Sequence, residues 1–169
     1  MSAQPDPTRQ NIIDWCQEDN IPSISDDAKN PQFVWAIGVG ATRISVYKII
    51  QIPDRIYFQS QINFSEIHRT LVNQTWNVNQ RNNMMHNLKK LVAQYDILMN
   101  FQLTNDELTG FHTYKIHHHP TISKADFLEK FLRVQAVHEV ILNQLNIELG
   151  IALQSDQANQ NSGDVNTGR

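Results

Sequence analysis

Apolar residues recur at every second position in three stretches of the first half of the chain, which predicts three β-strands. The first stretch covers residues 33–39, the second follows the tight Gly38–Gly40 connection, and the third follows the turn at Pro53. The third stretch separates cleanly into an apolar face with Ile56, Phe58 and Ile62 and a polar face with Arg55, Tyr57, Gln59 and Gln61. One buried face and one solvent-exposed face are typical of an antiparallel meander.

Spacings of three and four residues predict helices before and after these strands. The first helix begins at Asp6, an N-cap acceptor followed by proline, and ends before Pro22. Ser65 is expected to cap a short helix, and a further helix is expected over residues 77–94. The turn-rich segment 22–32 is predicted to be a loop.

The second half of the chain predicts two more strands and one long helix. Alternation is most regular over residues 97–103, and a loop over 104–110 separates this stretch from a fifth strand at 111–118. A capping box at Ser123 opens a helix that continues to about Leu149. The order α-βββ-αα-ββ-α groups the strands instead of alternating them with helices. The sequence therefore predicts an α+β fold with a five-stranded antiparallel sheet and a long C-terminal helix.

Length and charge narrow the class of protein. One domain is expected at residues 1–153, and the polar segment 154–169, which has no apolar period, is predicted to be a disordered tail. The 14 Lys and Arg residues are scattered and the formal net charge is −3, which argues against nucleic-acid binding. The sequence has no run of 18 apolar residues and no signal-peptide pattern, so we expect no membrane segment and a cytoplasmic protein.

The long final helix carries two apolar stripes, and one buried face cannot account for both. The stripe expected to cover the sheet comprises Phe127, Phe131, Val134, His138, Ile141 and Leu145, flanked by Leu128, Leu132 and Leu142. The second stripe comprises Val137, Val140, Gln144, Ile147 and Ile151. A helix of roughly 40 Å also exceeds the length of a strand, about 20–27 Å. The second stripe therefore either forms a homodimer or partner interface, or packs under the first helix of the same chain.

The histidine run at residues 117–119 is the main candidate for metal binding. On a strand only His117 and His119 share a face, together with Thr113 and Lys115, and this face is expected to be solvated. A His-x-His pair can chelate a metal ion if a third ligand is present, but no Cys or acidic residue lies nearby in sequence. A metal site and a solvated run of histidines both remain open.

The other motifs do not assemble an active site. Leu142 stands where a zinc-protease pattern would need a second histidine after His138, so we expect His138 to be a core residue kept neutral by a hydrogen bond. Cys16 lies on the inner face of the first helix, and a lone cysteine excludes an intrachain disulfide. The glycine pair at 38 and 40 lacks the third glycine of a dinucleotide site. We expect no enzymatic activity and no cofactor.

Three segments carry a family resemblance: Asn11-Ile12-Ile13-Asp14-Trp15 with Ile21-Pro22, Phe64-Ser65-Glu66-Ile67-His68-Arg69, and Thr121-Ile122-Ser123-Lys124-Ala125-Asp126-Phe127. With the element order, they resemble a prokaryotic domain-of-unknown-function family related to the YbjN-like proteins, a group similar in fold to the type III secretion chaperones. The resemblance extends over nearly the whole chain to Gly150. It implies a twisted antiparallel sheet with helices on one face, often assembled as a homodimer, and it transfers no catalytic residues.

Together these observations predict a non-enzymatic protein-interaction or chaperone-like module that forms a homodimer or binds another protein. The alternative is a metal- or small-ligand-binding regulatory protein that uses His117 and His119.

Overall fold

The structure, a computed structural model, describes residues 6–25 and 32–163. It contains four α-helices, one π-helical turn and six strands within these ranges. In chain order they are α1 (Pro7–Glu18), β1 (Ser23–Ser25), β2 (Phe33–Val39), β3 (Ile44–Ile49), β4 (Ile52–Asn63), α2 (Glu66–Thr70), η2 (Leu71–Thr75), α3 (Val78–Ala93), β5 (Leu98–Thr104), β6 (Glu107–His117) and α4 (Lys124–Gly163).

The predicted helix starts are confirmed by their caps. Asp6 accepts a hydrogen bond from the backbone N–H of Thr8 at 2.9 Å, and Ser65 accepts one from that of His68 at 3.3 Å. Asn77 opens α3 with a reciprocal capping box. Each cap satisfies backbone donors that a helix leaves unpaired at its first turn.

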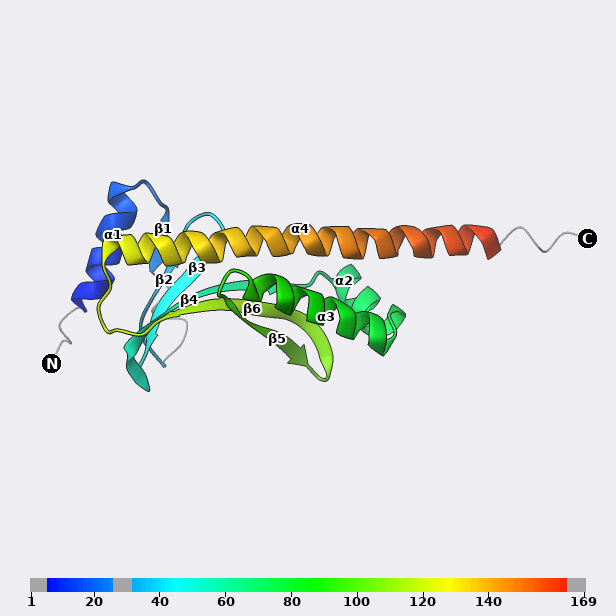
Figure 1. The fold of residues 1–169 in the computed structure, drawn as a ribbon, viewed down its shortest axis with the longest axis horizontal. Helices are drawn as coiled ribbons and strands as arrows, with labels where there is room; N and C mark the ends of the chain where they lie inside the picture. Colours follow the sequence, from blue (N-terminus) through cyan, green and yellow to red (C-terminus); the bar gives the residue numbers. More distant parts are fainter. Residues whose placement is uncertain (1–5, 26–31, 164–169) are drawn as a thin grey trace, which may run out of the picture.

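The fold has two layers, a single antiparallel sheet and a layer of helices on one of its faces. The strands follow the order β1-β2-β3-β4-β6-β5. Figure 1 shows α4 running lengthwise over the sheet, with α1 beside its first turns and α3 near its middle. The α+β class, the antiparallel pairing and the long C-terminal helix are as predicted.

The predicted number of five strands is wrong, because the segment expected to be a loop contains β1. Ile24 of β1 pairs with Gly38 of β2, so three residues extend the sheet by one edge strand. A three-residue strand at an edge has no room for a hydrophobic alternation, and its side chains are partly or fully exposed. The sequence pattern therefore holds no signal for it.

The predicted loop over residues 104–110 is also wrong in extent. The strands β5 and β6 are joined by a two-residue turn at Asn105 and Asp106, whose φ angles are 51° and 65°. Positive φ at both central positions is the geometry of a type I′ hairpin turn, which Asn and Asp tolerate better than other residues. The strand β6 therefore begins at Glu107.

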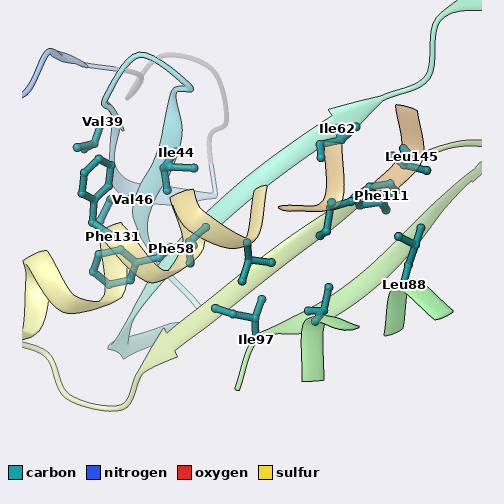
Figure 2. Packing of buried hydrophobic residues seen from close by; sticks show 14 of the residues in the cluster. Val39, Ile44, Val46, Phe58, Ile62, Leu88, Ile97, Phe111, Phe131 and Leu145 are labelled. Carbon is teal, nitrogen blue, oxygen red and sulfur yellow. The ribbon is translucent and has the colours of Figure 1, made fainter. Parts of the chain in front are cut away.

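The core lies between α4 and the sheet, and the first apolar stripe of the final helix is confirmed. Its members Phe127, Phe131, Val134, His138, Ile141 and Leu145 are all buried. Figure 2 shows Phe131 beside Val39 and Val46, and Leu145 near Phe111, so the stripe contacts several strands along its length. Burial of this apolar surface is the main force that docks α4 on the sheet.

The helix α4 is longer than predicted. It continues past Leu149 to Gly163, through the first part of the segment expected to be a disordered tail, while residues 164–169 lie outside the described residues. No proline interrupts this stretch, and Gln, Ala and Leu support a helix even where no apolar period marks it. Figure 1 shows this end of α4 projecting beyond the sheet. Across the ranges that the structure describes, no helix is both long and apolar enough to cross a membrane.

Candidate functional site

The face of the sheet opposite α4 is not covered by any described helix. Residues paired across antiparallel strands point to the same side, and Tyr57 of β4 pairs with Tyr47 on one neighbour and Ile116 on the other. We call the following set the open face: Phe33, Tyr47, Arg55, Tyr57, Gln59, Gln61, Leu98, Asn100, Gln102, His112, Tyr114 and Ile116.

Three aromatic rings on the open face stack against one another. The ring centroids of Phe33 and Tyr47 are 4.8 Å apart, and those of Tyr47 and Tyr57 are 5.2 Å apart with an interplanar angle of 8°. Stacked cross-strand rings stand upright on the sheet, so their flat faces contact each other.

The polar groups of the open face are largely uncharged and paired with each other. The Tyr47 hydroxyl donates to Oε1 of Gln59 at 2.6 Å, and Gln102 lies 2.7 Å from Nε2 of His112. Burial, with smaller contributions from nearby tyrosines, raises the pKa of Tyr47 to about 12, and burial lowers the pKa of His112. Both groups are therefore neutral near pH 7, and Arg55 is the single charged member of the set.

The residues of the second stripe of α4 lie in different environments. Val137 is only 1% exposed and belongs to the core, whereas Ile147 is 57% exposed. Val140 and Gln144 are half-buried, and Gln144 donates to Glu148 at 2.8 Å. The side chain of Ile151 lies outside the described residues. The sheet and the flanking α1 and α3 bury a wider sector of α4 than the first stripe alone, and this sector includes Val137.

Part of the expectation for β6 is wrong, because Thr113 and Lys115 lie on the face of the sheet that packs against α4. Thr113 pairs with Ser60 and is buried, and Lys115 pairs with Phe58. The Lys115 ammonium forms an ion pair with Asp96. The open-face residues of β6 are instead His112, Tyr114 and Ile116.

His117 and His119 come close together at the end of β6, with ring centroids 6.3 Å apart. Nε2 of His117 lies 2.9 Å from the carbonyl oxygen of Thr121, within hydrogen-bonding distance. Nδ1 of His119 contacts the same oxygen at 3.2 Å. Among the described residues, no three His, Cys, Asp or Glu side chains are grouped to hold a metal ion. The metal site stays a prediction, and the described residues provide no third ligand for it.

His138 is a core residue, as predicted, and its partner is a serine on the sheet. Nδ1 of His138 contacts Oγ of Ser60, and both residues are buried. Thr113, opposite Ser60 on β6, has a buried hydroxyl without a described partner. A polar residue at position 60, between two apolar inward positions, was the sequence signal for this contact. We interpret this Ser–His pair as a polar contact within the core.

The burial of His138 predicts a pH dependence of stability. Burial lowers the pKa of His138, although Glu139 opposes the shift, so the unfolded chain binds a proton more readily than the folded one. The contribution of neutral His138 to the free energy of unfolding is complete above the pKa of the unfolded chain, about 6.5. It decreases as the pH falls toward the pKa of the folded protein. In urea titrations between pH 5 and 8, His138→Leu should remove up to about 1.4 kcal/mol per pH unit of this slope. His112→Gln is the control, because burial also lowers the pKa of His112. An unchanged slope in His138→Leu would contradict the assignment of the pH dependence to His138.

A surface pocket of ≈ 690 Å³ lies where α1, β3 and the loop before α4 meet. Its lining residues are Asp6, Pro7, Thr8, Val34, Lys48, Pro120 and Thr121. The buried Lys48 ammonium is 2.9 Å from Asp6 and 3.2 Å from the carbonyl oxygen of Pro120. Both charges are therefore engaged within the protein. We interpret this pocket as a structural junction that ties three segments together. Lys48 is a polar residue at a buried position of β3, where the alternation of the strand would place an apolar one.

No family model and no curated protein matches the chain. The chain is similar in three dimensions to solved structures that include the following two. An uncharacterized protein from Methanothermobacter thermautotrophicus aligns with a TM-score of 0.71 at 10% identity, over 84% of this chain and 99% of that chain. YbjN from E. coli aligns with a TM-score of 0.48 at 7% identity, over 82% of this chain and 91% of that chain. The archaeal protein shares the fold, whereas the YbjN alignment is too weak to carry an argument. The link to secretion chaperones stays a prediction.

Proposed function

We propose that the protein is a non-enzymatic, chaperone-like interaction module that binds another protein through the open face of its sheet. The observation that carries this proposal is the upright aromatic stack of Phe33, Tyr47 and Tyr57 on a sheet face that no described helix covers. Tyrosine-rich surfaces are typical of protein interfaces, because each ring buries a large area at low entropic cost and offers a hydroxyl for hydrogen bonds.

The chemistry of the open face favours a protein over other ligands. A single-stranded nucleic acid needs a basic groove and free ring faces. Arg55 is the single basic residue of the open face apart from neutral His112, and the aromatic rings of this face stack on each other. A charged small molecule would need opposite charges to bind, and the open face offers one guanidinium and no carboxylate. Amide and hydroxyl groups, together with exposed Leu98, match the mixed polar and apolar surface of a folded or extended polypeptide.

The proposal predicts that a charge at Leu98 abolishes partner binding. Leu98 is 52% exposed on the open face, so Leu98→Asp leaves the core intact while it places an unpaired carboxylate within the interface. Ile67 on α2 is 64% exposed and outside the open face, so Ile67→Asp is a matched control. Quantitative affinity enrichment from the native cell extract should lose a specific protein by at least tenfold with Leu98→Asp and retain it with Ile67→Asp. Equal recovery with both variants would refute the open face as the binding surface.

A further inference from the structure

The strand β5 forms one edge of the sheet and pairs with β6 alone (Figure 1). Successive residues of a strand direct their N–H and C=O groups to opposite sides, so every second residue of β5 points its backbone away from β6. Among the described residues, no backbone group outside β6 bonds to the backbone of β5. An unpaired strand edge is a template on which another strand can form.

The two edges of the sheet differ in length and in protection. The opposite edge strand, β1, has three residues, and the Arg9 side chain of α1 donates to the Ser25 hydroxyl there at 2.9 Å. The strand β5 has seven residues, LMNFQLT, with no proline and no charged side chain. Proteins commonly protect a long edge with lysine or proline, because both discourage strand pairing. The sequence of β5 therefore leaves this edge open to another strand.

The regular part of this edge is residues 98–102, because the ladder with β6 shifts its register between Gln102 and Leu103. We call the outward backbone of residues 98–102 the β5 edge. Met99 and Phe101 direct their half-buried side chains to the helix layer, whereas their neighbours in the strand belong to the open face. A strand added at the β5 edge would therefore extend the core on one side and the open face on the other.

We propose that the β5 edge binds an extended segment of the partner protein, which adds a seventh strand to the six-stranded sheet. This inference rests on the proposed function, because the same partner then continues over the open face. The segment that fits has uncharged side chains, apolar where they cover Met99 and Phe101 and polar on the other side. The exposed carboxylates of Asp106 and Glu107 stand at the hairpin turn beyond β5, so a Lys or Arg at that end of the segment is attracted to them.

The available area favours a separate partner over a second copy of this chain. Five residues at about 3.4 Å each make an edge of about 17 Å, and a sheet is about 10 Å thick, so edge-to-edge contact buries on the order of 200 Å² on each side. Pairing of two β5 edges would bury about 400 Å² in total, well below the roughly 1,200 Å² of a specific interface. It would also place the two open faces side by side, where neither adds contact area.

A partner chain that continues from the β5 edge over the open face gains the missing area. Tyr57 on β4 is two strand spacings from β5, which is about 10 Å. A few residues beyond the added strand therefore reach the aromatic stack. The edge supplies backbone hydrogen bonds that fix the direction of the segment, and the open face supplies most of the buried surface.

Peptide selection on the full-length wild-type protein tests the proposed chemistry of the segment. The probe is a displayed library of random peptides of about 12 residues, and we expect enrichment of alternating apolar and uncharged polar residues with a Lys or Arg at one end. Backbone N-methylation of a selected peptide, one position at a time, should weaken binding at least tenfold at every second position and less than threefold between them. No enriched peptide, or N-methyl effects without this period of two, would overturn the proposal.

Proline variants place the selected peptide on β5. Of Met99→Pro and Asn100→Pro, one removes an N–H that bonds to β6, and the other removes an N–H of the outer edge, where proline is tolerated. Urea unfolding identifies the more stable variant, which should bind the peptide at least tenfold more weakly, whereas alanine at the same position keeps the N–H and should bind within about threefold. In the wild type, the peptide should slow hydrogen exchange at alternate amides of residues 98–102. Unchanged binding by the more stable proline variant, or unchanged exchange in the wild type, would overturn the proposal.

The same variants separate the β5 edge from the open face. A partner from cell extract that the more stable proline variant retains but Leu98→Asp loses would support the open face and overturn pairing at the edge. Peptide binding with a period of two, together with equal partner recovery by Leu98→Asp and Ile67→Asp, would support the edge and refute the open face. A wild-type dimer that the proline variant loses would assign the edge to a second copy and overturn the choice of partner.

Discussion

Replacing Gly110 with alanine is expected to lower the free energy of unfolding by about 3 kcal/mol, the upper part of the range for overpacked sites. Gly110 lies in β6 between β4 and β5, opposite Asn63 and Gln102. A Cβ atom there would be 2.2 Å from the backbone carbonyl oxygen of Ile62. A backbone atom within the sheet cannot move away without breaking strand pairing, so the strain stays in the folded state.

Gly150 provides the control with the same chemical change and the opposite expected sign. It lies within α4, and an added Cβ would meet no atom within 4 Å. Gly150→Ala should therefore raise the free energy of unfolding by about 0.5–1 kcal/mol, the gain of alanine over glycine in a helix. Urea unfolding of the two variants measures both values. A loss below about 1 kcal/mol in Gly110→Ala would contradict the packing of β6 between its neighbours.

Asp6→Ala is expected to cost about 3 kcal/mol, because Asp6 both caps α1 and pairs with buried Lys48. The Asp6 carboxylate is 2.9 Å from the Lys48 ammonium, and the Lys48 side chain is 9% exposed. Removal of the carboxylate leaves a buried ammonium without its counter-charge. Lys48→Met removes the charge instead, and an unpaired Asp6 remains partly solvated, so this variant should lose no more than about 1 kcal/mol.

The same pair predicts how the difference between wild type and Asp6→Ala depends on pH. Burial alone would raise the pKa of Asp6, but the hydrogen bonds from Lys48 and Thr8 outweigh it and lower the pKa below 3.8. A depressed carboxyl pKa stabilises the fold above the unfolded value and loses that contribution as the pH falls through the folded value. Urea titrations should therefore show the difference shrinking below about pH 4. Equal losses in Asp6→Ala and Lys48→Met at pH 7 would contradict the buried ion pair.

Most of the fold could be predicted from the sequence, because the spacing of apolar residues and the capping side chains indicate the same boundaries for the long helices and strands. Alternation in β4 marks its buried Phe58 and its open-face Tyr57, and the helix caps at Asp6 and Ser65 are read from single side chains. The strand β1, which the sequence did not predict, is too short to show an alternation of apolar residues. It forms because its backbone pairs with that of β2. Such tertiary pairing leaves no local trace.

The candidate sites were harder to predict, because exposure depends on what packs from other parts of the chain. Val137 belongs by periodicity to an outward stripe, but the neighbouring elements bury it, whereas Leu132 was expected near the covered face and is exposed. The aromatic stack of the open face depends on strand register, which places Phe33, Tyr47 and Tyr57 side by side from three strands. Polar inward residues such as Ser60 and Lys48 were visible only as breaks in alternation, and their partners His138 and Asp6 lie far away in sequence.

The most direct test of the open face as a protein-binding surface is site-specific photo-crosslinking in native cell extract. A photoreactive benzoylphenylalanine replaces Tyr57 at one end of the aromatic stack, and the control places the same group at Lys90, exposed on α3 in the helix layer. We predict one defined protein adduct from position 57 and none of that mass from position 90. The absence of an adduct from position 57, or the same adduct from both positions, would contradict the account.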